Sequence, residues 1–246
     1  MNISKYNLTA FKTIDDLNKA AAEFILDTAQ KAIAVRGCFI ISLSGGQTPA
    51  GLYKLLASSL YNTKLPWQNI FVFWGDERCV PLNDERNNAY QAKKILLDEI
   101  KVPVQNIHRI QTNHQPIVAA AKYEKELNIF FKGHEQQFDL ILLGLGENGH
   151  TASIFPGTDL VIEKSIGVRA VYVAEEDTYR VSMTAPLINK ARNILFLVTG
   201  ITKAPVLRNV LIGLYEPSMY PAQLIKPNSG SLLWFTDEEA ASLLTS

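Results

Sequence analysis

Hydrophobic residues along this chain fall into two repeating patterns. Short runs that are apolar at nearly every position are typical of strands buried on both faces. Longer segments with apolar residues at helical spacing predict amphipathic helices. The apolar runs are CFIISLS (38–44), IFVFWGDE (70–77), FDLILLG (138–144), AVYVAE (170–175) and ILFLVTG (194–200), with a terminal segment SLLWFTDEEAASLL (231–244). The segments with helical spacing are 16–37, 48–61, 87–100, 117–131 and 203–213.

The alternation of these patterns predicts one α/β domain over residues 1–246, with a mostly parallel sheet covered by helices on both faces. No internal repeat and no linker rich in Gly, Ser or Pro divides the chain. The run RVSMT (180–184) differs, because polar and apolar residues alternate in it, and it predicts an antiparallel or edge strand. Open α/β sheets bind ligands beyond the carboxyl ends of their strands, so chemistry is expected in the loops that follow strands.

Composition changes this picture only by exclusion. The 246 residues include 24 Lys and Arg and 24 Asp and Glu, so the net charge is zero and no basic stripe indicates nucleic acid. The N-terminus lacks a secretory pattern, and no apolar stretch is long enough to span a membrane, so we expect a soluble cytoplasmic protein. Cys38 and Cys79 lie in or beside apolar runs, which favours two small buried side chains over a disulfide or a metal pair.

The loop LSGGQTPAG (43–51) joins a predicted strand to a predicted helix. Ser44, Gly45, Gly46 and Thr48 place hydroxyls and uncrowded backbone amides at the start of that helix, which suits a phosphate group. The loop lacks the Gly-Lys-Ser/Thr ending of a Walker A motif. An ordinary strand-to-helix turn would use the same residues for geometry alone, so the loop by itself leaves both interpretations open.

Three charged residues follow the strongly apolar run that ends at Trp74. Asp76, Glu77 and Arg78 either turn to solvent or line a polar cleft, because buried charges are costly unless they are paired. Their place at the carboxyl end of a strand favours the cleft.

The stretch GLGENGH (144–150) matches the spacing of a dinucleotide-binding loop, but it lies in mid-chain and lacks the acidic residue expected about 20 residues later. His150 precedes Thr151 and Ser153, which are typical residues at a helix start. A helix N-terminus disfavours the imidazolium, and a neutral imidazole is what a general base requires. A histidine that only caps or packs is the alternative.

Two further cations occur later in the chain. Arg180 begins RVSMT, and Lys203 follows ILFLVTGIT at the opening of a helix. Each alone is typical of a surface charge, but with the glycine loop they would supply the two positive charges that a phosphate dianion needs.

Six blocks of the chain, taken in order, resemble one known family. They are LSGGQTP (43–49), WGDERCVP with RNNAY (74–90), FDLILLGLGENGHTASIFPG (138–157), YRVSMTAPLINKA (179–191), TGITK (199–203) and PAQLIKPNSGSLLWFTDEEA (221–240). The set resembles the 6-phosphogluconolactonases, whose closest relatives in fold are the glucosamine-6-phosphate deaminases. The resemblance implies a Rossmann-like, deaminase-like fold and hydrolysis of the δ-lactone of 6-phosphogluconate, with no metal and no organic cofactor.

The resemblance also implies roles for individual residues. The family's general base is the histidine that here is His150, and the arginine of its D-E-R block, here Arg78, lies at the active site. The glycine loop with Arg180 and Lys203 would hold the substrate's phosphate. The chain departs from the family at Asn148, where aspartate is usual and could orient the imidazole and stabilise its cation. It also carries Gln47 where serine is common.

The hypothesis from sequence is that His150 deprotonates a water that attacks the lactone carbonyl. Arg78 would stabilise the oxyanion, with Asp76 or Glu77 positioning it. The expected partner is a small phosphorylated sugar lactone, and the expected state is a monomer or a weak homodimer. Metal, nucleic acid and membrane are not expected.

Two alternatives remain. A glucosamine-6-phosphate deaminase or isomerase would need carboxylate bases near the histidine, and here Asn148 precedes Gly-His and no acid follows before Asp159. A non-catalytic sugar-phosphate sensor would need only the phosphate site, and such proteins usually carry a DNA-binding segment for which this chain has no basic module.

Overall fold

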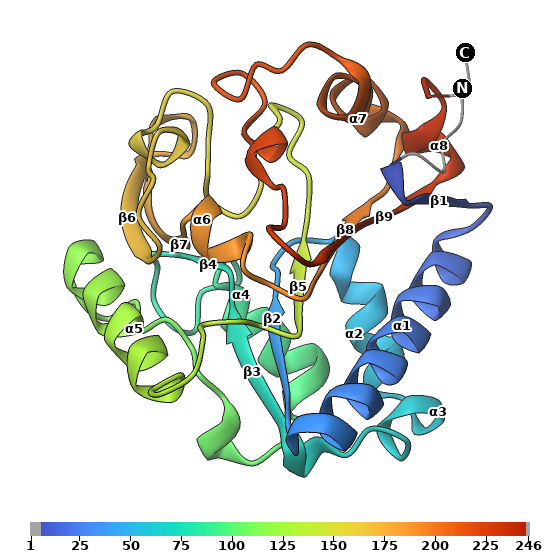
Figure 1. The fold of residues 1–246 in the computed structure, drawn as a ribbon, viewed down its shortest axis with the longest axis vertical. Helices are drawn as coiled ribbons and strands as arrows, with labels where there is room; N and C mark the ends of the chain where they lie inside the picture. The colour runs from blue at the N-terminus through green and yellow to red at the C-terminus, as the bar shows by residue number, and fades with distance from the viewer. Residues whose placement is uncertain (1–5, 245–246) are drawn as a thin grey trace.

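The computed structural model describes residues 6–244 and places the apolar runs in two sheets (Figure 1). The larger sheet has six strands in the order β1-β9-β8-β5-β2-β3, and every pairing in it is parallel. Its strands are β1 (Leu8–Phe11), β2 (Phe39–Leu43), β3 (Ile70–Trp74), β5 (Leu140–Leu143), β8 (Asn193–Val198) and β9 (Ser231–Asp237). The prediction of a mostly parallel sheet with flanking helices is confirmed.

The first helix, α1 (Ile14–Arg36), shows how the sequence sets helix ends. The Thr13 hydroxyl accepts the backbone N–H of Asp16, and Gly37 ends the helix in the left-handed conformation at φ 77°. The other helices are α2 (Thr48–Ala57), α3 (Ser59–Asn62), α4 (Asn88–Ala92) with a π-helical turn (Lys93–Leu97), α5 (Pro116–Phe130), α6 (Ala185–Ile188), α7 (Ala204–Ile212) and α8 (Glu238–Ala241). No helix within residues 6–244 is long and apolar enough to cross a membrane.

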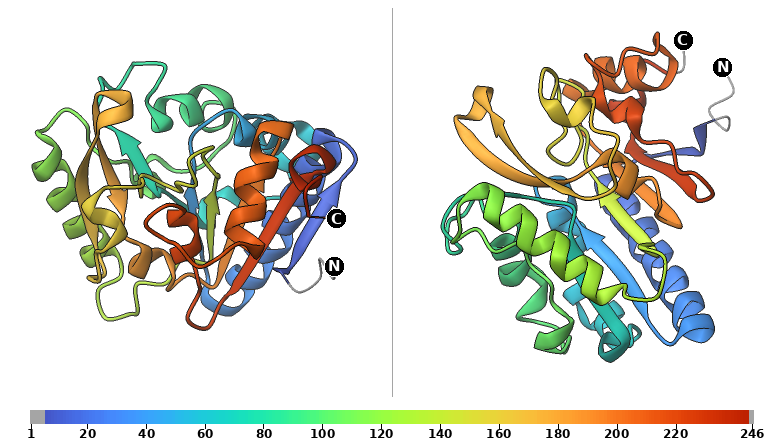
Figure 2. Two further views of the ribbon diagram at one scale, coloured as in Figure 1. Left: turned by 90° about the horizontal axis from the view of Figure 1, so that it is seen from above. Right: turned by 60° about the vertical axis from the view of Figure 1, so that its left-hand side comes forward.

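A second, antiparallel sheet of three strands stands beside the first. Its order is β4-β7-β6, with β4 (Asp76–Arg78), β6 (Val168–Val173) and β7 (Thr178–Met183). Helix α5 packs against β6 and β7, as Figure 2 shows. The two ends of the sequence-predicted strand 70–77 thus belong to different sheets, and Gly75 separates them. The Gly75 amide still bonds to the Leu43 carbonyl of the large sheet, while its carbonyl accepts the amide of Met183 on β7.

The alternating run RVSMT is antiparallel as predicted, but it is the central strand of its sheet and not an edge. Arg180, Val181, Ser182 and Met183 are all buried. The alternation arises because Arg180 and Ser182 contact a buried polar cluster, whereas Val181 and Met183 belong to the hydrophobic core. A polar residue in a strand therefore marks a buried polar neighbour here, and not solvent.

The two cysteines, Cys38 and Cys79, are free thiols and half-buried. Burial raises the pKa of both thiols, which keeps them protonated and unreactive near neutral pH.

Candidate active site

One cavity of about 680 Å³ opens at the carboxyl ends of the neighbouring strands β8, β5 and β2. This is the position expected for a ligand site in an open α/β sheet. Nine of the residues given a role from the sequence line the cavity, although they come from five separate loops and strands, whereas Glu77 and Asn148 do not line it. The nine are Ser44, Gly45, Gly46, Thr48, Asp76, Arg78, His150, Arg180 and Lys203.

The glycine loop between β2 and α2 presents its backbone to the cavity. The Tyr53 hydroxyl fixes this loop, because it donates to the Ser44 carbonyl at 2.7 Å and accepts the Ser44 amide at 3.1 Å. Gly46 has φ 98°, a conformation that favours glycine. Helix α2 has no side-chain cap at its N-terminus, but Pro49 there has no N–H and the Ala50 amide donates to the Gln47 carbonyl at 3.1 Å, so the amides that suit an anion are those of the glycine loop and Thr48. The Thr48 and Thr199 hydroxyls lie 3.2 Å apart beside these groups.

A glycine is needed at position 45 because a side chain from another wall of the cavity occupies the space that a Cβ would fill. A Cβ at this position would lie 1.8 Å from Oδ1 of Asn88, the first residue of α4. Asn88 donates its Nδ2 to the Asp76 carbonyl at 3.0 Å, and its Oδ1 has no hydrogen-bond partner among the described residues. The absence of a side chain at Gly45 therefore lets the two walls approach each other.

Asp76, Glu77 and Arg78 line a polar site and do not turn to solvent. Glu77 is fully buried, and its carboxylate accepts the backbone amides of Arg78, Asn88 and Ala89 at 2.7–2.8 Å. Burial raises the pKa of the Glu77 carboxyl to about 7, against the three amides, which favour its charged form. Glu77 thus fixes the backbone of Arg78 to the start of α4.

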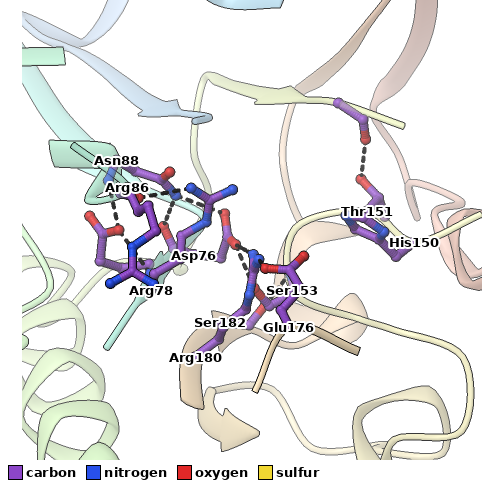
Figure 3. Close-up of polar contacts among 12 residues, drawn as sticks. Asp76, Arg78, Arg86, Asn88, His150, Thr151, Ser153, Glu176, Arg180 and Ser182 are labelled. Carbon is purple, nitrogen blue, oxygen red and sulfur yellow. Dashed lines mark hydrogen bonds and ion pairs between the residues drawn. The ribbon is translucent and has the colours of Figure 1, made fainter. Parts of the chain in front are cut away.

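Arg78 and Asp76 have different partners from those that the hypothesis assigned. The Arg78 guanidinium donates to the Arg86 carbonyl at 2.8 Å, and no hydrogen bond joins it to Asp76 among the described contacts. Asp76 instead accepts the Ser153 hydroxyl at 2.5 Å and lies 3.7 Å from the Arg180 guanidinium. Figure 3 shows these two groups of contacts next to each other.

Arg180 is the most deeply buried cation of the site, with only 2% of its side chain exposed. Its guanidinium pairs with Asp76 and Glu176 and lies over the Phe155 ring, 5.1 Å from the centroid. A buried charge of this kind is tolerable only because it is paired. Arg180 also lines the cavity, so its positive charge acts on a ligand bound there.

The loop that carries His150 depends on two of its glycines. Gly149 has φ 80°, and a Cβ there would lie 2.9 Å from the backbone of Tyr220. A Cβ at Gly146 would lie 2.1 Å from both Nδ1 and Cε1 of His150, so Gly146 provides the space that the imidazole occupies. The glycines therefore serve the histidine.

The prediction that Thr151 and Ser153 begin a helix is wrong. Residues 151–158 form turns and an isolated bridge. The Thr151 hydroxyl donates to the Gly144 carbonyl, and Ser153 is fully buried against Asp76. Both hydroxyls bond across the tertiary structure, so neither caps a helix.

His150 is nevertheless held as a neutral imidazole. Burial first, and then the charges of Arg180, Lys203 and Arg78, lower the pKa of the ring from 6.5 to about 3. The Phe155 ring stacks on the imidazole, with the two ring centroids 3.8 Å apart. The Asn148 Oδ1 lies 2.6 Å from Nδ1, so Nδ1 carries the proton and donates, and no described residue bonds to Nε2.

Titration of His150 tests this electrostatic account. We expect the ring to remain neutral when the pH is lowered through 6.5 and to protonate only near pH 3, where the charged form becomes favourable. Lys203→Met removes one of the repelling cations, so the pKa of His150 should rise. Histidine ring resonances followed by NMR against pH measure both values. Protonation of His150 near pH 6.5 in the unmodified protein, or a pKa that Lys203→Met leaves unchanged, would contradict the account.

Lys203 lies at the start of α7 with 23% of its side chain exposed. Its Nζ lies 3.8 Å from the carboxylate of Glu147, which is mostly exposed at the edge of the cavity. Such an exposed contact is weak, so a bound anion can replace it.

Sequence reasoning missed several residues of this site. Asn88, Thr199 and Thr202 line the cavity, yet they lie inside blocks that carried the family resemblance and were given no role. The acidic pair Glu175 and Glu176 also contacts site residues, and no signal in the local sequence distinguishes it from a solvent-exposed turn. No group of three or more His, Cys, Asp or Glu side chains within residues 6–244 is placed to hold a metal ion.

The fold and the cavity together define an α/β protein with a ligand-sized site at the carboxyl ends of a parallel sheet. The chain belongs to the glucosamine-6-phosphate isomerase/6-phosphogluconolactonase family, whose sequence model matches residues 12–234.

Individual relatives agree with this assignment. A 6-phosphogluconolactonase of Synechocystis sp. is 43% identical over 219 residues, which are 87% of this chain and 88% of that protein. The crystal structure of devB protein is 37% identical, superposes with a TM-score of 0.87 and covers 96% of this chain and 98% of its own. The 6-phosphogluconolactonase from Trypanosoma cruzi is 26% identical, with a TM-score of 0.84 over 98% of this chain and 97% of its own.

Proposed function

We propose that this protein hydrolyses 6-phospho-D-glucono-1,5-lactone to 6-phospho-D-gluconate in the oxidative pentose phosphate pathway. The observation that carries the proposal is a neutral imidazole, oriented through Nδ1, in a cavity that also contains Arg78, Arg180 and Lys203. Relatives that match most of the chain are 6-phosphogluconolactonases.

In this mechanism His150 is the general base. Its Nε2 takes a proton from a water molecule while the water oxygen attacks the lactone carbonyl carbon. A pKa near 3 makes the free imidazole a weak base. A phosphate dianion bound beside Lys203 offsets the positive charge that lowers this pKa, so binding of the substrate makes His150 more basic. The enzyme thus gains its base in the complex that needs it.

Attack on the carbonyl produces a tetrahedral oxyanion, and Arg78 is the cation assigned to stabilise it. Arg78 lines the cavity. Its backbone amide donates to the Glu77 carboxylate and its guanidinium donates to the Arg86 carbonyl, so both parts of the residue are held in place. Collapse of the intermediate breaks the bond from the carbonyl carbon to the ring oxygen. The ring oxygen leaves as an alcohol after it receives the proton from the His150 imidazolium.

The phosphate end of the substrate is assigned to the part of the cavity wall formed by the glycine loop and Lys203. The backbone amides of that loop and of Thr48, together with the Lys203 ammonium, present N–H donors and positive charge there. Arg180 contributes positive charge from the wall of the cavity. Anchoring the phosphate holds the reacting carbonyl at a fixed position relative to His150, which is an orientation effect.

Lys203→Ala tests the phosphate site. We expect the KM for the phosphorylated lactone and the Kd for 6-phosphogluconate to rise about 10- to 100-fold, because a charge-assisted contact of about 1.5–3 kcal/mol is lost. The effect on kcat should be smaller. Lys190→Ala, which removes a lysine paired with Glu135 outside the cavity, is the control. An unchanged KM in Lys203→Ala would remove Lys203 from the phosphate site.

The function itself is tested by generating the lactone in situ from glucose 6-phosphate and following its hydrolysis with and without the protein. Spontaneous hydrolysis is measured in parallel and subtracted. Glucosamine 6-phosphate serves as a second substrate, since its deamination would support the isomerase side of the family. Binding of 6-phosphogluconate without acceleration of either reaction would favour a sugar-phosphate sensor.

A further inference from the structure

The general base is joined to a carboxylate by way of Asn148. The Asn148 Oδ1 lies 2.6 Å from His150 Nδ1, and its Nδ2 donates to Glu175 Oε2 at 2.9 Å. Glu175 lies 25 residues beyond His150, in the turn Ala174–Glu176 that connects β6 to β7. The three side chains therefore form a continuous hydrogen-bonded chain from carboxylate to amide to imidazole.

An amide orients a histidine differently from a carboxylate, because its two ends are not equivalent. When Oδ1 faces Nδ1, the imidazole carries its proton on Nδ1 and leaves Nε2 free to accept one. When Nδ2 faces Nδ1, the proton must be on Nε2 and the base is lost. Asn148 therefore supports catalysis in only one of its two orientations.

Two contacts select the productive orientation. The backbone amide of His150 donates to Asn148 Oδ1 at 3.2 Å, a long contact from a neutral group. Glu175 accepts a hydrogen bond from Nδ2 at 2.9 Å. If the amide turned over, Oδ1 would face Glu175 instead, and no hydrogen bond could form because a carboxylate and an amide oxygen both only accept. A charge-assisted hydrogen bond is the stronger of the two.

We propose that Glu175 is a positioning residue for the reaction: through Asn148 it fixes the tautomer of His150 and supplies the negative charge that asparagine lacks. The inference rests on the proposed role of His150 as the base. The same turn also holds Arg180, because Glu176 pairs with its guanidinium. The tip of the β6–β7 hairpin thus fixes both the base and the buried cation of the site.

Activity measurements in two backgrounds test the proposal. Glu175→Ala should lower kcat about three- to tenfold with KM within about twofold, because one exposed, charge-assisted hydrogen bond is lost. Glu175→Gln should recover only part of this loss, because its amide oxygen can still accept from Asn148 Nδ2, but its amide nitrogen can also donate and the negative charge is absent. Glu135→Ala removes an exposed carboxylate outside the cavity and controls for net charge.

The second background is Asn148→Asp. Both ends of an aspartate accept, so the tautomer of His150 no longer depends on Glu175. The two carboxylates would also repel each other, since an oxygen replaces Nδ2 2.9 Å from Glu175 Oε2. Glu175→Ala should therefore leave kcat unchanged or raise it in Asn148→Asp, although the same substitution lowers kcat when Asn148 is present. A merely structural role for Glu175 would produce the same loss in both backgrounds, and that result would overturn the proposal.

The tautomer is also read directly, without any assay of activity. Long-range ¹H–¹⁵N spectra of the histidine rings should show His150 protonated on Nδ1, and Glu175→Ala should add a population protonated on Nε2. His150→Ala assigns the resonance. An unchanged tautomer in Glu175→Ala would refute the positioning role even if the protein is an active lactonase. A changed tautomer in a protein without lactonase activity would support the positioning role and leave the proposed function as the part that failed.

Discussion

Replacement of His150 by alanine is expected to lower kcat for lactone hydrolysis by about 10²–10⁴, which is the usual contribution of a general base. The substituted protein keeps Arg78, Lys203 and the glycine loop, so the Kd for 6-phosphogluconate should change little. The measurement is the rate of hydrolysis above the spontaneous background, together with the Kd of the product by calorimetry.

Two further measurements make this result specific to the base. His134→Ala removes an exposed histidine from the same chain and should leave kcat unchanged. Added imidazole should restore part of the activity of His150→Ala, because the space left beside Phe155 can accept a free ring in the stacked position. A kcat for His150→Ala close to that of the unmodified protein would exclude His150 as the base.

The second large effect is expected from Gly146→Ala, which should lower kcat by about 10²-fold. The new Cβ would lie 2.1 Å from His150 Nδ1, so the imidazole must move away from Asn148 and Phe155. A displacement of about 1 Å at a catalytic group is enough for a loss of this size. Gly146 does not have a positive φ, so alanine is compatible with the backbone and the protein should still fold.

Gly144→Ala is the matched control within the same glycine motif. A Cβ at Gly144 meets no heavy atom within 4 Å, and its φ is not positive. Thermal unfolding of both variants shows whether any loss of activity comes from stability. Equal activity in the two variants would show that the space at Gly146 is not needed to position the imidazole, and would weaken the assignment of His150 as the general base.

Much of the fold could be predicted from the periodicity of hydrophobic residues. Runs such as FIISL and LILL are apolar at every or nearly every position because parallel strands are covered on both faces, and this leaves a strong local signal. Helix α1 was also predictable, since its amphipathic pattern is long and ends at Gly37. These features depend on neighbouring residues alone.

Local pattern failed where residues bond to distant partners. Thr151 and Ser153 have the residue types of a helix start, yet their hydroxyls bond to Gly144 and Asp76 and no helix forms. RVSMT was predicted as an antiparallel or edge strand; it is antiparallel but central, and its polar positions belong to a buried polar cluster that includes the Arg180–Asp76 pair. In both cases long-range polar contacts decided the structure.

The site also has features that the sequence could predict and features that depend on contacts between distant residues. The rule that ligands bind beyond the carboxyl ends of parallel strands places the loops after β2, β5 and β8 together, and the structure has a cavity at that edge. The sequence could not show which of the site's charged groups pair with each other. Asp76 pairs with Arg180 and not with Arg78, and Glu175 reaches His150 only through Asn148.

The sequence by itself determined most of the order of strands and helices, though not β1 or the break between β3 and β4, together with the loops that line the cavity and the family, because these depend on local periodicity and on motifs that are contiguous in the chain. Only the tertiary structure decided how His150 is made and kept neutral. Burial and three cations from separate parts of the chain lower the pKa of the ring, and Asn148 links the ring to a carboxylate 25 residues away. Such effects fall off with distance in space and not along the chain, so no local pattern of residues contains them.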